Sequence, residues 1–161
     1  MRIGSRKLLL LAVLVVIIIL ILLLPFTLYI YKFKTNLQDN LEKWSNLSSG
    51  HYEMVVASNA HTTCTGGWNT VIVEHGKVTK GRNAECDDCT LEDFSHLTVE
   101  ALFDRIWEEC IHHRPWYLPF PVCNVAYDDQ LGCPIRLDTY TFTPEGEYLP
   151  SITVDSIIFL P

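Results

Sequence analysis

Acidic residues are missing from the start of the chain, and charge of either sign is missing from the stretch that follows. All 19 Asp and Glu lie beyond residue 34, and residues 8–31 contain no charged residue. Residues 8–24 form an unbroken run of 17 apolar residues. At about 1.5 Å per helical residue, residues 8–30 are long enough to cross a hydrocarbon core of roughly 30 Å. The sequence therefore predicts one transmembrane helix over residues 8–30, in contact with the lipid bilayer.

This segment also lacks the marks of a cleaved signal peptide. Its apolar core exceeds the usual length of about 7–15 residues, and no A-x-A-like site ends it. An uncleaved signal-anchor is therefore favoured. Basic residues are more frequent before the helix than after it, which places residues 1–7 in the cytoplasm as a basic tail and the C-terminal part outside. The residues concerned are Arg2, Arg6 and Lys7 before the helix and Lys32 and Lys34 after it.

The remainder of the chain has few basic residues. Five of the 12 Lys and Arg lie in residues 1–34, so residues 35–161 carry a formal charge of −12. A domain this acidic is repelled by phosphate backbones, which excludes nucleic acid as a favoured partner. Leu37, Leu41 and Trp44 recur at helical spacing, so residues 31–50 are predicted to form a helical stalk or linker. Residues 51–161 then form one extracytoplasmic domain.

Cysteine is absent from the apolar segment, and all six cysteines lie in the acidic part. An even number of cysteines in a small translocated domain indicates disulfides. Six cysteines allow 15 complete pairings, and the sequence does not choose among them. The candidate disulfide cysteines are Cys64, Cys86, Cys89, Cys110, Cys123 and Cys133.

Internal repeats are absent, and the elements expected beyond residue 50 are mostly short strands. Alternating apolar residues predict strands at 51–58, 68–74, 77–79, 123–127 and 135–139 and a last strand at 151–159. Residues 80–96 have no clear period and are predicted to form a loop. An apolar stripe predicts an amphipathic helix from Val99 to Cys110, capped by Thr98. The sequence therefore predicts an α+β fold: an antiparallel sheet of about four or five strands, one helix packed on one face, and one preceding transmembrane helix.

Several short motifs occur in a characteristic order. They are Tyr52, Cys64, the segment 71–78 (VIVEHGKV), the segment 97–103 (LTVEALF), the segment 125–128 (VAYD), the segment 132–135 (GCPI) and Asp138. In this order they resemble a family of bacterial extracytoplasmic domains of unknown function, often found in lipoproteins. The chain departs from the family's pattern at Cys133, where an aromatic residue is usual, and in the additional pair Cys86 and Cys89. The resemblance implies the fold and an extracytoplasmic location, and it implies no activity.

Recognisable catalytic arrangements are also missing. The sequence has no nucleophile elbow, no Ser-His-Asp arrangement and no glycine-rich phosphate loop. The pair Cys86 and Cys89 permits structural disulfides, metal binding or thiol–disulfide chemistry, and the flanking Glu85, Asp87 and Asp88 oppose formation of a reactive thiolate. A zinc site would need further ligands at spacings that the sequence does not show. Structural disulfides are the favoured interpretation, and no cofactor, metal site or catalytic residue is expected.

One uncharged aromatic loop, residues 116–120, contrasts with the rest of the acidic domain. It is either packed on the edge of the sheet or exposed as a contact surface for a partner. The leading functional hypothesis for the whole chain is a membrane-anchored, non-catalytic module that binds a protein or ligand of the cell envelope. The alternative is a thiol–disulfide or metal-binding protein centred on Cys86 and Cys89. The candidate contact residues of the loop are Trp116, Tyr117, Leu118 and Phe120.

Overall fold

The structure is a computed structural model, and it divides the chain into two compact units. They comprise Met1–Asn36 and Leu37–Pro161. The residues whose structure is described are 5–47, 49–59, 64–112, 123–139, 141–143, 146–148 and 151–161.

The first helix, α1 (Ser5–Leu47), joins the predicted membrane segment and the predicted stalk in one continuous element. Within Leu10–Leu47 its most apolar window has a mean hydropathy of 3.3, and no residue of that window is buried. By length and composition this helix can span a membrane. Pro25 lies inside it, where it removes one backbone hydrogen bond, a loss that membrane helices tolerate.

The second unit is built on a six-stranded antiparallel sheet with the strand order β3-β2-β1-β8-β5-β4. A separate two-stranded hairpin, β6–β7, lies between β5 and β8 in the sequence. The strands are β1 (His51–Ser58), β2 (Gly67–Glu74), β3 (Lys77–Asn83), β4 (Cys123–Tyr127), β5 (Pro134–Thr139), β6 (Thr141–Thr143), β7 (Gly146–Tyr148) and β8 (Ser151–Phe159).

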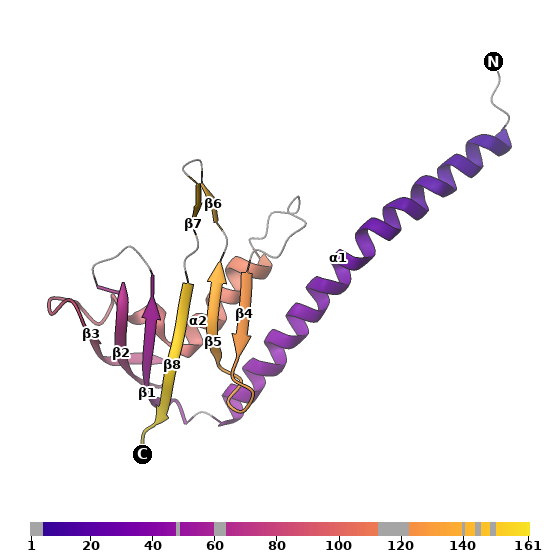
Figure 1. The fold of residues 1–161 in the computed structure, drawn as a ribbon. Helices are drawn as coiled ribbons and strands as arrows, with labels where there is room; N and C mark the ends of the chain where they lie inside the picture. Colours follow the sequence, from indigo (N-terminus) through magenta and orange to yellow (C-terminus); the bar gives the residue numbers. More distant parts are fainter. Residues whose placement is uncertain are drawn as a thin grey trace. The chain divides into compact units, whose positions relative to one another are not determined.

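One face of the sheet carries the core. The helical segments η1 (Ser95–Leu97), α2 (Val99–Arg105) and η2 (Ile106–His112) follow β3, and α2 lies behind the sheet in Figure 1. Side chains from both layers are fully or almost fully buried, because the alternation in the strands and the stripe in the helix face each other. The largest of them are Tyr52, Met54, Phe94, Leu97, Leu102, Ile106 and Leu137. The predicted α+β fold is confirmed.

Three details differ from the prediction. The sheet has six strands rather than four or five. β3 continues to Asn83 and pairs along β2, where the sequence predicted a loop from residue 80. The predicted helix begins at Val99, with the Thr98 hydroxyl accepting a hydrogen bond from the Ala101 amide at 3.1 Å. It remains α-helical only to Arg105 and continues as the π-helix η2. The apolar stripe does not distinguish these two windings over so short a segment.

The last turns of α1 belong to the second unit and pack against it. Leu37 and Trp44 are buried, and the Lys43 ammonium donates to the Asp129 carbonyl at 2.8 Å. Gly132, with φ +74°, lies so close to the helix that an added Cβ would stand 2.7 Å from the Asn40 carbonyl oxygen. A side chain at this position is therefore excluded both by the backbone conformation and by the contact.

A carboxylate on α2 connects three elements of this unit. The Tyr52 hydroxyl donates to Glu100 Oε2 at 2.6 Å, and the Trp44 indole N–H donates to Glu100 Oε1 at 3.1 Å. The same tyrosine hydroxyl accepts a bond from the Val99 amide at 3.0 Å, so it satisfies one of the free amides at the start of α2. Burial, together with the bond to Glu100, raises the pKa of Tyr52. Tyr52 therefore stays a neutral donor that holds α1, β1 and α2 together.

Candidate functional site

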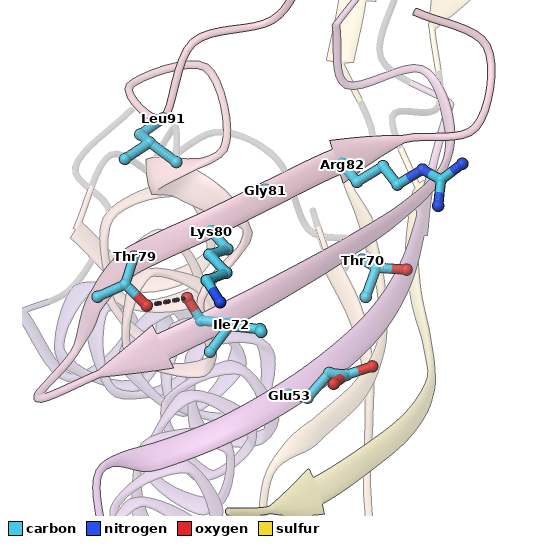
Figure 2. Close-up of a pocket in the computed structure, with 8 residues that line it drawn as sticks. All are labelled: Glu53, Thr70, Ile72, Thr79, Lys80, Gly81, Arg82 and Leu91. Carbon is cyan, nitrogen blue, oxygen red and sulfur yellow. Dashed lines mark hydrogen bonds between the residues drawn. The ribbon is translucent and has the colours of Figure 1, made fainter. Parts of the chain in front are cut away.

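The face of the sheet opposite the core carries an open groove of about 720 Å³ over β1, β2 and β3 (Figure 2). Strand alternation places its residues, since the neighbours Met54, Val71 and Val73 point to the core. Cross-strand pairing aligns Glu53 with Ile72 and Ile72 with Lys80 in one row. The groove is lined by Glu53, Thr70, Ile72, Thr79, Lys80, Gly81, Arg82 and Leu91.

The chemistry of the groove is amphipathic. Ile72 and Leu91 supply apolar surface, and the side chains of Lys80 and Arg82 extend from β3 (Figure 2). Within the described part of the chain, neither of these two cations forms an ion pair. Thr79 donates to the Ile72 carbonyl at 3.4 Å, which joins β3 to β2 at one end of the groove. The groove thus presents two unpaired cations and one carboxylate, Glu53, which gives its lining a net charge of +1 on a strongly acidic domain.

Close packing of Phe94 against Gly81 covers the side of β3 that faces away from the groove. The Phe94 ring is fully buried and lies against Gly81, in the space that a Cβ at this position would need. The ring therefore covers one side of β3, and the strand approaches it closely because residue 81 has no side chain.

A second candidate site is a cluster of three sulfur atoms. Cys64 and Cys89 form a disulfide with Cα atoms 5.4 Å apart, and Cys86 is a free thiol. The three Sγ atoms lie within 4.8 Å of one another, and all three residues are half-buried. A metal would need thiolates from Cys64 and Cys89, so it would compete with the disulfide.

Two buried asparagines at the ends of β2 and β3 hold the loops around this cluster. Asn83 Nδ2 donates to the Cys64 carbonyl at 3.2 Å, to the Gly66 carbonyl at 2.8 Å and to Asn69 Oδ1 at 2.8 Å. Its Oδ1 accepts from the Glu85 amide at 2.7 Å. One side chain thus fixes the backbone on both sides of the sulfur cluster, at Cys64 and just before Cys86.

The remaining predicted cysteines lie at two other places. Cys110 at the end of η2 and Cys123 at the start of β4 form a second disulfide. Cys133 is buried as a free thiol, and burial, with a contribution from the nearby Asp128, raises its pKa to about 11. Four of the six candidate cysteines are therefore paired as expected, whereas Cys86 and Cys133 differ from the expectation. An even count gives no information on which cysteines the fold brings together.

The predicted contact residues of the aromatic loop lie outside the described residues. They are Trp116, Tyr117, Leu118 and Phe120. Asp128 accepts hydrogen bonds from the Gln130 and Leu131 amides at 2.8 and 2.7 Å, so its carboxylate stabilises the turn between β4 and β5.

Sequence reasoning missed the groove and the asparagine pair. Lys80 and Arg82 stand two residues apart, the spacing that places side chains on one face of a strand, but the segment was predicted to be a loop. Asn69 and Asn83 pair across β2 and β3, and this contact becomes visible only once the strand register is known.

Comparison with known proteins gives no identification. No protein family, no curated protein and no solved structure was found to match the chain. The resemblance to bacterial extracytoplasmic domains stays a prediction from the motifs.

The raised pKa of Cys133 predicts a loss of stability in alkali. An unfolded thiol titrates near 9 and the folded one near 11, so the unfolded state releases its proton first as the pH rises. Stability is complete below pH 9 and decreases from pH 9 to 11, by about 1.4 kcal/mol at pH 10. Urea unfolding of the full chain at pH 8 and pH 10 measures this loss. Cys133→Ala should remove it, leaving only the loss from buried tyrosines that both proteins share. An equal loss in both proteins would contradict the assignment.

Proposed function

We propose that the chain is a membrane-anchored, non-catalytic binding domain that lies outside the cytoplasm and takes up an acidic segment of an envelope protein. The apolar helix α1 supports anchoring. The excess of basic residues before it supports a cytoplasmic N-terminus. The two disulfides support an oxidising compartment for the domain.

The observation that carries the binding proposal is the pair Lys80 and Arg82 in the groove. The domain is strongly acidic, whereas the groove holds two cations without an ion-pair partner and one carboxylate, Glu53, so its lining has a net charge of +1 and forms a local field of opposite sign. An acidic segment is attracted to this field and repelled by most of the remaining surface, which gives charge complementarity.

The spacing of the two cations indicates an extended partner. Side chains two residues apart on a strand lie on one face and are separated by about 6.6 Å. A peptide in the same conformation places its own alternate side chains at this distance. Carboxylates at alternate positions can therefore meet Lys80 and Arg82, with the intervening backbone running along β3, an edge strand of the sheet.

Binding of a defined peptide tests this proposal. The full chain, in a non-ionic detergent, is titrated against a labelled peptide of alternating glutamate and valine, and fluorescence anisotropy is measured. We expect binding that weakens with salt, and a loss of about fivefold in affinity for Lys80→Ala, the scale of one exposed ion pair.

Lys77→Ala is the matched control, because it removes the same charge from the same strand outside the lining of the groove. It should change the affinity by less than about twofold. Equal effects of the two variants, or equal binding of a peptide in which lysine replaces glutamate, would overturn the proposal.

A further inference from the structure

We propose that the cluster of Cys64, Cys86 and Cys89 is a site of intramolecular thiol–disulfide exchange, in which Cys64 alternates between Cys89 and Cys86 as its partner. This inference is independent of ligand binding in the groove. It rests on a free thiol beside a disulfide and on the way in which the surrounding loops are held.

The distances allow the exchange. The Cys86 Sγ atom lies within 4.8 Å of both sulfur atoms of the disulfide. A disulfide bond is about 2.05 Å long, so a new bond to Cys86 requires a shift of the sulfur atoms of less than about 3 Å. Such a shift is within the reach of side-chain rotation at Cys86 and Cys89, which are three residues apart.

The Asn83 contacts keep Cys64 beside both possible partners. Asn83 holds the Cys64 and Gly66 carbonyls and the Glu85 amide, so the loop that carries Cys64 is tied to the segment that precedes Cys86. Cys86 and Cys89 both lie on the connection between β3 and η1, three residues apart and outside regular secondary structure. Pairing Cys64 with Cys86 closes a span only three residues shorter than the separation of 25 residues in the Cys64–Cys89 pair. Chain entropy therefore distinguishes little between the two disulfides.

The step is balanced without any further reagent. The Cys86 thiolate attacks the Cys64 Sγ atom, the Cys64–Cys89 bond breaks, and the Cys64–Cys86 bond forms. The electron pair of the broken bond leaves on the Cys89 Sγ atom, which takes up the proton that Cys86 released. One disulfide and one thiol are present before and after, so no oxidant or reductant is consumed.

Mapping of the free thiol tests the exchange. The full chain is held in detergent at pH 8.5, quenched in acid, alkylated in denaturant at mildly acidic pH, digested and sequenced by mass spectrometry. We expect the label on both Cys86 and Cys89, each in at least about a tenth of the molecules. Label confined to Cys86 would overturn the proposal. Label on Cys64 would overturn the assignment of Cys64 as the shared partner. Cys133, a free thiol in either state, is the internal standard.

Two variants test the exchange whichever of the two disulfides, Cys64–Cys89 or Cys64–Cys86, is the more stable. Cys89→Ser should show a complete Cys64–Cys86 disulfide, with near-ultraviolet circular dichroism like that of the parent protein. Cys86→Ser should retain the Cys64–Cys89 disulfide and take up label only at Cys133. Two free thiols at Cys64 and Cys86 in the folded Cys89→Ser protein, isolated under oxidising conditions, would show that the exchange product does not form.

Discussion

Replacement of Trp44 by alanine should destabilise the second unit by about 3–5 kcal/mol, the usual cost of truncating a large buried aromatic residue. Trp44 is 2% exposed. Its ring meets the Tyr52 ring edge-on at 5.2 Å and stacks on Phe159 at 5.8 Å between centroids. The substitution also removes the indole N–H that donates a hydrogen bond to the Glu100 carboxylate. Urea unfolding of the full chain in detergent, followed by near-ultraviolet circular dichroism, measures the change.

Leu41→Ala is the matched control for this prediction. Leu41 lies one turn earlier in α1 and is 43% exposed, so its truncation should cost less than about 1 kcal/mol. Similar losses for the two variants would contradict the burial of Trp44 as the cause of its effect. A large loss at Trp44 only would mean that the helix end is part of the core.

Replacement of Gly81 by alanine should cost about 1–3 kcal/mol through overpacking. The added Cβ would overlap the Phe94 ring, which is 1% exposed and has little room to move. The backbone of Gly81 is not in the left-handed region, so the loss would come from the contact and not from the backbone conformation. Thermal unfolding monitored by circular dichroism measures this loss.

A second substitution separates overpacking from other causes. Phe94→Leu in the Gly81→Ala background provides space for the new methyl group. The double variant should therefore lose at least about 1 kcal/mol less than the sum of the two single variants. Simple additivity would contradict overpacking as the cause.

Much of the fold could be predicted because its elements carry local periodic signals. The alternation of Tyr52, Met54 and Val56 predicts β1, and the residues from Thr98 onward predict the start of α2 correctly. The length of β3 could not be predicted, because its second half contains Gly81 and Asn83, which are unfavourable in strands, and is held by pairing with β2. The π-helical end of α2 likewise depends on packing rather than on local sequence.

The candidate sites were less predictable than the fold, because they depend on contacts between distant segments. The sequence singled out Cys86 and Cys89 as a pair, but the structure joins Cys89 to Cys64 and leaves Cys86 as a thiol. Loop conformation and strand register decide this pairing, and neither is encoded in cysteine spacing. The groove could not be predicted for the same reason. Glu53 and Lys80 lie in one row only because three strands pair in a particular register.

The central position of β8 has a consequence for the order of events during synthesis. β1 pairs with β8, so Tyr52 finds its neighbour Phe159 only after about a hundred further residues have left the ribosome. A sheet whose middle closes last has a high contact order, and its folding is slow compared with that of a helical bundle. Cys64, Cys86 and Cys89 all emerge before β8 does. In the oxidising compartment proposed above, a disulfide between any two of these three cysteines can therefore form in a nascent chain, before the completed sheet restrains them.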